Sequence, residues 1–208
     1  TVARSLEGQG AQMRALSMLA WNQPVVVLAT VEEVTQYVVS PQYVVSQSVH
    51  LEVSQSIERD ELLEKLVTIG YERVDQVEQR GHFSVRGDIF DIFPVNSDDP
   101  IRMEFFGDEI DTMRHFSVDT QRSIENVDAY TVTPFYLTSD DADSTLLSYA
   151  KEGLIIYDEP GRIQEALKKY LKEDATHRKQ HCDWSELHRT VEAKIQVAFT
   201  FMQQRSIG

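Results

Sequence analysis

Hydrophobic and polar residues alternate most regularly between residues 101 and 106. Successive side chains of a β-strand lie on opposite faces, so this stretch is expected to be a half-buried strand. One face would carry the apolar side chains Ile101, Met103 and Phe105. The other would carry Arg102, Glu104 and Phe106. An aromatic ring among charges on an outward strand face is typical of a docking surface rather than of a core.

The stretch just before it, residues 83–92, is also rich in β-branched and aromatic residues, but its periodicity changes midway. The apolar positions of residues 83–89 and 90–92 have opposite parities. A one-residue slip near Gly87 would reconcile them, and glycine is the residue that a bulge prefers. We therefore expect a bulged strand, with Arg86 on its outward face beside Arg102.

Helical and strand patterns flank this β-rich stretch on both sides. Amphipathic helices are predicted at residues 11–21, 30–38, 58–69, 144–151, 163–171 and 184–192. Further strands are predicted at 49–53, 109–116, 129–135 and 195–201, those at 109–116 and 129–135 completing the sheet. All-apolar runs at 25–29 and 154–157 are typical of strands buried in a parallel sheet. We expect an α/β domain made of residues 1–47 and 135–208, with a β-rich α+β domain at 48–134 inserted into it.

Composition narrows the classes of partner. The chain has 208 residues, 34 acidic and 20 basic, and a formal net charge of −14. So acidic a surface repels phosphate backbones unless basic residues are segregated, and no Lys/Arg run is visible, which disfavours DNA binding by this chain alone. The single cysteine, Cys182, excludes an internal disulfide and favours a reducing, cytoplasmic setting. No apolar run has the length of a membrane span, so we expect no membrane association.

One pattern raises the question of nucleotide chemistry. Residues 154–159 have the shape of a Walker B strand, and its terminal acids Asp158 and Glu159 could hold Mg²⁺. That chemistry also needs a Gly-x-x-x-x-Gly-Lys-Ser/Thr loop to cradle phosphates, and the sequence has none. We therefore interpret the two acids as a relic that caps the following helix, and assign no catalytic or cofactor-binding residue.

A second pattern raises the question of a metal site. His177 and His181 are spaced to share one helical face, with Cys182 and His188 close by. The charged residues 178–180 between them are typical of a solvated loop, and no Cys-x-x-Cys supports the site. We assign no metal ligand here.

Two strings in the β-rich stretch carry a resemblance to a known family. They are YERVDQVEQRGHFSVRGDIFDIFP at residues 71–94 and IRMEFFGDEID at residues 101–111. Together they resemble the UvrA-interacting domain shared by the excision-repair protein UvrB and the bacterial transcription-repair coupling factors. The string FSVDTQRSI at 116–124 and the valine at position 74 are more similar to the coupling factors. The chain is thus identified as an N-terminal, UvrB-like part of a coupling factor, with weaker similarity beyond the two strings.

The resemblance implies which residues contact UvrA. At the matching positions Arg86, Arg102 and Phe106 look like contacts with UvrA, and Arg73 and Glu104 match positions that UvrB uses. Ser84 departs from the pattern, because UvrB has a further arginine there. From the residues alone, a surface cluster in which Arg102 pairs with Glu104 or Asp88 is an equally good interpretation.

The resemblance also implies a function. The expected role is a non-catalytic module that recruits UvrA to RNA polymerase stalled at DNA damage. The full-length relative would be an ATP-dependent DNA translocase that contacts RNA polymerase and double-stranded DNA through other regions, and its UvrB-like part would have lost its ATPase machinery. Two alternatives stay open: a fragment of UvrB itself, and a metal-dependent hydrolase using Asp158, Glu159 and the downstream histidines.

Overall fold

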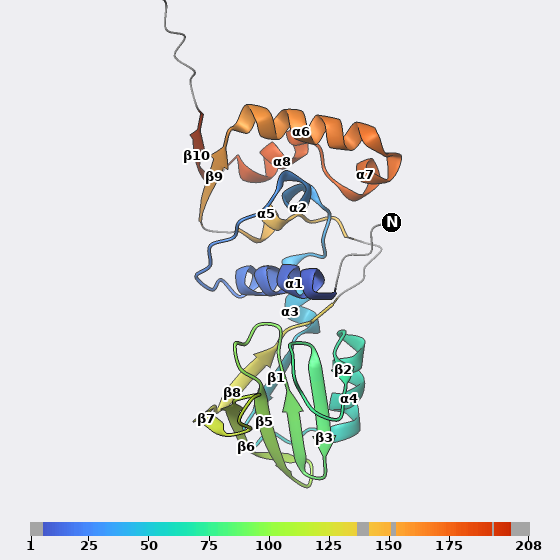
Figure 1. Ribbon diagram of the computed structural model, residues 1–208, viewed down its shortest axis with the longest axis vertical. Helices are drawn as coiled ribbons and strands as arrows, with labels where there is room; N and C mark the ends of the chain where they lie inside the picture. Colours follow the sequence, from blue (N-terminus) through green and yellow to red (C-terminus); the bar gives the residue numbers. More distant parts are fainter. Residues whose placement is uncertain (1–5, 137–141, 151–152, 193, 201–208) are drawn as a thin grey trace, which may run out of the picture. The chain divides into compact units, whose positions relative to one another are not determined.

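The computed structural model describes residues 6–136, 142–150, 153–192 and 194–200. Internal contacts divide the chain into two compact units, one comprising residues 1–25 and 41–139 and the other residues 26–40 and 140–208. Figure 1 shows the helices and strands of both units. The expected insertion of a domain at residues 48–134 remains a prediction. Within the described ranges, no helix combines the length and the apolar character needed to pass through a bilayer.

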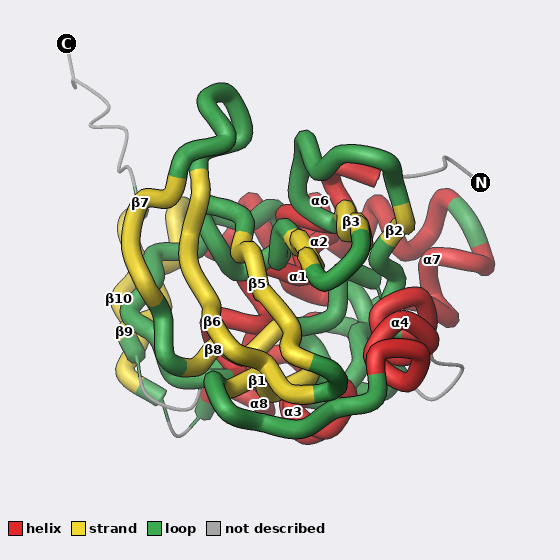
Figure 2. Tube along the Cα trace, turned by 90° about the horizontal axis from the view of Figure 1, so that it is seen from below, coloured by secondary structure: helices red, strands yellow, loops and turns green. Residues whose placement is uncertain are grey.

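A six-stranded sheet forms the centre of the first unit. Its strands lie in the order β2-β3-β4-β5-β6-β7, with β2 parallel to β3 and every other pair antiparallel. The strands are β2 (Glu72–Arg73), β3 (His82–Arg86), β4 (Ile89–Ile92), β5 (Ile101–Phe106), β6 (Glu109–Phe116) and β7 (Ser123–Asn126). The long antiparallel pair β5–β6 can be followed in Figure 2.

The change of apolar parity around Gly87 marks a hairpin, so the prediction of a bulge is wrong. Arg86 pairs with Ile89, which makes Gly87 the first residue of a two-residue turn between β3 and β4. Its φ of 61° is left-handed, as two-residue hairpin turns require. Residues opposite each other share a face, so Val85 and Phe90 both face the core although their parities differ. Ile89, expected with the buried residues, lies opposite Arg86 on the other face.

Helix α4 (Arg59–Thr68) packs against one face of this sheet. Leu62 and Leu66 are fully buried, as their spacing predicts, whereas Val67 is 58% exposed and does not join the stripe. Gly70 follows the helix with a φ of 94°, as expected for a glycine at this position. The buried sheet residues that share one hydrophobic core with Leu62 and Leu66 are Phe83, Phe90, Ile92, Ile101, Met103, Phe105, Ile110 and Met113. Each large side chain buried in this way stabilises the fold by about 1.5–3 kcal/mol before the cost of ordering the chain.

A second, antiparallel sheet in the same unit consists of β1 (Val49–Glu52) and β8 (Ala129–Val132). The strand predicted at 129–135 therefore does not complete the six-stranded sheet, because β7 takes the edge position beside β6. Both strands nevertheless contribute to the main core. Helices α1 (Leu6–Ala20) and α3 (Pro41–Gln47) also belong to this unit, and α1 agrees with the helix predicted there.

The second unit combines short helices with a pair of parallel strands. Its elements are α2 (Val31–Thr35), α5 (Leu146–Tyr149), β9 (Leu154–Asp158), α6 (Pro160–Glu173), α7 (Ala175–Gln180), α8 (Trp184–Val191) and β10 (Ile195–Phe199). Thr30 and Glu33 form the predicted capping box at the start of α2. A small core gathers Leu147, Cys182, Leu187 and Val191.

Two apolar runs of the chain are not buried as predicted. Residues 25–29 form no strand, and Val26 and Leu28 are 89% and 92% exposed. Strand β9 does form, in parallel with β10, but Leu154 and Ile156 remain more than half exposed. An apolar run can be buried only if neighbouring strands and helices cover it, and the described residues supply no such cover.

Both units thus combine helices with strands, of mixed orientation in the first unit and parallel in the second, and the predicted α/β class is confirmed.

Candidate partner-binding surface

The face of the six-stranded sheet opposite α4, called here the outer face, carries a group of polar side chains. One cross-strand row consists of Ser84, Asp91, Arg102 and Arg114. The next row, closer to the hairpin turns, consists of Arg86, Ile89, Glu104 and Thr112. Strand pairing therefore brings together residues that are far apart in the sequence. Arg102, Glu104 and Phe106 lie on the outward side of β5, as their alternation predicts.

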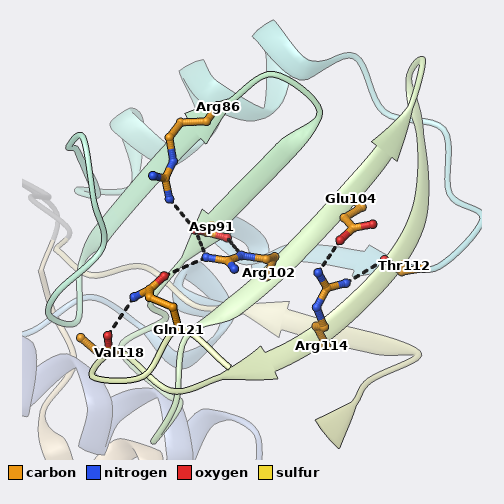
Figure 3. Close-up of polar contacts among 8 residues, drawn as sticks. All are labelled: Arg86, Asp91, Arg102, Glu104, Thr112, Arg114, Val118 and Gln121. Atoms are coloured by element: carbon orange, nitrogen blue, oxygen red, sulfur yellow. Dashed lines mark hydrogen bonds and ion pairs between the residues drawn. The ribbon is translucent and has the colours of Figure 1, made fainter. Parts of the chain in front are cut away.

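Asp91 is at the centre of the outer face. Its side chain is only 2% exposed, and Arg102 donates to both of its oxygens, from Nε to Oδ1 at 2.7 Å and from Nη2 to Oδ2 at 2.8 Å. Arg86 approaches the same carboxylate, with Nη2 3.7 Å from Oδ2 (Figure 3). A carboxylate buried without a partner costs several kcal/mol in lost hydration, so the arginines are what make a charge tolerable here.

Arg102 contacts three side chains around it. Besides Asp91, its Nη2 donates to Gln121 Oε1 at 3.0 Å, and its guanidinium lies 4.3 Å from the centre of the Phe116 ring. The hydrogen bonds to Asp91 raise the pKa of Arg102 above its usual value. Its side chain is 14% exposed. Arg102 is therefore a fixed part of the sheet, with a small area open to a partner.

Gln121 comes from the loop between β6 and β7 and was not singled out by the sequence. Its φ of 58° is unusual for a residue other than glycine. Its Nε2 donates to the carbonyl of Val118 at 2.8 Å while its Oε1 accepts from Arg102 (Figure 3). The loop thus supplies a polar clamp for Arg102, which only the position of the loop in space reveals.

The remaining pairs on this face differ from those expected of a simple salt-bridge cluster. Glu104 pairs with Arg114, which also donates to Thr112. Arg102 contacts Asp91 in place of Glu104 or Asp88, so the expected pairing is wrong. Charge on the outer face is thereby largely balanced within the sheet.

Two side chains stand out as accessible on this face. Phe106 ends β5 and is 84% exposed, and the side chain of Arg86 at the end of β3 is 56% exposed. Ile89, across the strand from Arg86, is 37% exposed. A cation and apolar side chains thus lie at the hairpin end of the outer face, where each could be covered by a partner.

Arg73 is not brought together with the other predicted contacts. It pairs in register with Phe83 across β2 and β3, so its side chain belongs to the face that packs on α4. There it lines a shallow groove with Leu63 and Val67. A partner lying on the outer face would have to extend past the sheet edge to reach it.

The candidate metal site does not assemble. His177 lies in α7, not in a solvated loop, and its ring stacks on Tyr170 with centroids 3.9 Å apart. His181 is buried, and its backbone forms an isolated antiparallel β-bridge with that of Gln36. Burial raises the pKa of the Cys182 thiol to about 11. In the part of the chain that the structure describes, no group of three or more His, Cys, Asp or Glu side chains is arranged to hold a metal ion.

The acids at the carboxyl end of β9 are Asp158, its last residue, and Glu159, which occupies the N-cap position of α6. Glu159 has a left-handed φ of 56°, and its side chain makes no capping hydrogen bond. The expectation that these acids cap the helix is wrong in this respect. A capping side chain needs an extended backbone at that residue, which Glu159 does not have.

Comparisons with known proteins bear on the same stretch. Residues 49–136 match the family model of the UvrB interaction domain. A transcription-repair-coupling factor of Bacillus subtilis is 35% identical over 130 residues, which is 62% of this chain and 11% of that protein. One of Mycobacterium bovis is 44% identical over 96 residues, covering 46% of this chain and 8% of that protein.

A UvrABC system protein B of Streptococcus mutans is 37% identical over 159 residues, or 73% of this chain and 24% of that protein. The matches therefore span only about a tenth to a quarter of the length of these relatives. The outer face lies wholly inside the matched residues. The chain contains a UvrB interaction domain at residues 49–136, and over part of its length it is similar to the transcription-repair-coupling factors.

Proposed function

We propose that this chain is a protein-interaction module that binds UvrA through the outer face of its six-stranded sheet. The observation that carries the proposal is Phe106, which is 84% exposed at the hairpin end of the outer face, inside the residues that match the UvrB interaction domain. A large exposed ring on a rigid strand is the kind of side chain that dominates binding energies, because it buries much area and loses little entropy.

The chemistry of the face indicates what it would meet on UvrA. Arg86 lies 3.7 Å from Asp91 and its side chain is 56% exposed, so a carboxylate of the partner would complete its hydrogen bonding. Phe106 and Ile89 would enter an apolar recess next to that carboxylate. Arg102 and Glu104 contribute at the centre of the face, and Arg73 would contact UvrA only where the partner reaches the α4 side.

The experiment is calorimetric titration of this chain with UvrA, comparing the wild type with Arg86→Ala and Phe106→Ala. Each substitution is expected to weaken binding by at least ~2 kcal/mol, roughly thirtyfold. Arg189→Ala and Phe199→Ala are the matched controls, because both residues are exposed in the second unit. The controls should leave the affinity unchanged. Equal binding by all four variants would refute this face, and no binding by the wild type would refute the function.

The similarity to transcription-repair-coupling factors supports a finer role, which we also propose. In a longer protein of that kind, the module would recruit UvrA to RNA polymerase stalled at DNA damage in the cytoplasm. It would not be catalytic itself, and an ATP-driven motor acting on double-stranded DNA would lie elsewhere. Residues 48–134 would form the UvrA-binding domain, inserted into a degenerate UvrB-like domain of residues 1–47 and 135–208.

A second candidate is a part of UvrB, favoured by the 37% identity to a UvrABC system protein B over 73% of this chain. The two candidates differ in whether the full-length protein would bind stalled RNA polymerase. In the full-length protein, Arg86→Ala with Phe106→Ala should abolish capture of UvrA on stalled transcription complexes while retention of the protein itself on those complexes persists. A full-length protein that is not retained on stalled complexes at all would favour UvrB.

A further inference from the structure

The two accessible side chains of the outer face sit immediately before two separate hairpin turns. Arg86 precedes Gly87 in the turn between β3 and β4, and Phe106 precedes Gly107 in the turn between β5 and β6. Both glycines have left-handed φ values, 61° and 65°. The hydrogen bonds between strands end at a hairpin turn, so these bonds alone do not set the distance between the two turns.

One side chain links the two turns. Arg59, the first residue of α4, donates from Nη1 to the carbonyl of Gly87 at 2.9 Å and from Nη2 to the carbonyl of Gly107 at 3.0 Å. Its Nη2 also lies 3.0 Å from Asp88 Oδ1. Its guanidinium lies 5.5 Å from the centre of the Phe105 ring, which anchors it against the core.

The planar fork of an arginine suits this task. A guanidinium has five N–H donors in fixed directions, so it can bind two carbonyls and a carboxylate at once, whereas an ammonium is a single point on a flexible stem. The side chain of Arg59 is 29% exposed, so part of each contact is shielded from water. Two backbone hydrogen bonds reinforce the link, from Phe105 N–H to the carbonyl of Asp88 and from Ile57 N–H to the carbonyl of Asp108, both 2.8 Å.

We propose that Arg59 is a positioning residue for partner binding, which fixes the separation of Arg86 and Phe106 by fastening the two hairpin turns to the start of α4. The inference rests on the proposed binding of UvrA at the outer face. Side chains already held in their bound arrangement lose less conformational freedom on association, so a fixed pair binds more tightly than a mobile one. Arg59 itself need not touch the partner.

The first test compares Arg59→Ala with Arg80→Ala in titrations with UvrA. Arg80 is a close match: it donates to the carbonyl of Ser97 at 2.8 Å, pairs with Asp98 at 3.1 Å and lies 5.2 Å from the centre of the Phe93 ring. It makes these contacts away from the two hairpin turns. Arg59→Ala is expected to weaken UvrA binding about tenfold, and Arg80→Ala less than about twofold. Arg59→Lys should restore only part of the loss.

A double-mutant cycle separates positioning from a general loss of stability. Combined with Arg86→Ala and Phe106→Ala, Arg59→Ala should add less than about twofold, because the side chains it positions are gone. An undiminished tenfold loss in that background, or an equal loss from Arg80→Ala, would overturn the inference.

Hydrogen exchange tests, without any partner, whether Arg59 holds the two hairpin turns against the start of α4. In the free protein, Arg59→Ala should speed exchange of the Phe105 and Ile57 amides, roughly tenfold, with exchange of the Met103 amide in the sheet unchanged. Unchanged exchange at all three positions would overturn the inference.

If the wild type binds UvrA and Arg59→Ala binds equally well, this inference alone fails. If the wild type does not bind UvrA, the proposed function fails with it.

Discussion

Three arginines of the same sheet region have different surroundings, and these indicate different roles. Arg102 is enclosed by Asp91, Gln121 and the Phe116 ring, so it serves chiefly to neutralise the buried carboxylate. Arg86 touches the same carboxylate but is 56% exposed and can reach a partner. Arg59 binds backbone carbonyls and fixes the geometry of two turns. Residue type alone does not distinguish these roles; the burial and the acceptors do.

Replacement of the buried acid tests its structural role. Asp91→Asn keeps the shape of the side chain but leaves Arg102 without its counter-charge, so we expect a loss of about 2–4 kcal/mol in the free energy of unfolding. Asp98→Asn is the control: Asp98 pairs with Arg14 and Arg80 but is 81% exposed, and the loss should stay below ~1 kcal/mol. Urea denaturation measures both. Similar small losses would show that Asp91 is not required to balance Arg102.

At the scale of elements, the fold of the first unit depends on where its chain reverses. Gly87 allows β3 and β4 to pair, and Gly70 ends α4 so that the chain can enter β2. The surroundings of the two glycines differ. A Cβ on Gly87 would have no heavy atom within 4 Å, whereas one on Gly70 would lie 2.9 Å from the backbone nitrogen of Tyr136.

This difference predicts unequal costs for the same substitution. Gly87→Ala should lower the free energy of unfolding by about 1 kcal/mol, because only the left-handed backbone is strained. Gly70→Ala should cost at least ~2 kcal/mol, because the backbone around Tyr136 must also move. The urea midpoints of the two variants measure the difference. A cost for Gly87→Ala equal to or above that for Gly70→Ala would contradict this account.

At the scale of the whole molecule, net charge and local charge point to different partners. The chain carries a net charge of −14, yet its outer face presents Arg86 beside apolar side chains. The arginines near it are mostly paired with acids of the same sheet. Such a face suits a protein surface with a single acidic group better than a run of phosphates.

This argument predicts weak interaction with DNA. Binding of the chain to a fluorescent duplex at physiological salt should have a dissociation constant above ~10⁻⁴ M, because net repulsion opposes a non-specific electrostatic contact. Fluorescence anisotropy measures it, with UvrA binding by the same preparation as the control for folded protein. Micromolar binding that falls steeply with added salt would show a cationic surface that the outer face does not account for.

The periodicity of apolar residues along the chain predicted many of the helices and strands, because it depends only on residues that are close in the sequence. The alternation of residues 101–106 placed Phe106 on the outward side of β5, and the spacing of Thr30 and Glu33 predicted the start of α2. The sequence likewise predicted helix α4, with Leu62 and Leu66 buried, and helix α6, with Leu167 buried, because the apolar stripe of a helix repeats within one element.

Tertiary structure decided what depends on partners distant in the chain. Whether Gly87 made a bulge or a turn depended on which strands paired, and that pairing moved Ile89 to the outer face. The link between Asp91 and Arg102, the clamp from Gln121 and the reach of Arg59 between two turns each join residues separated by a reversal of the chain. Burial of an apolar run depends on what covers it, so Leu28 and Ile156 are exposed despite their sequence. A sequence pattern fixes the direction of a side chain relative to its own strand, and only long-range packing determines which residue it meets.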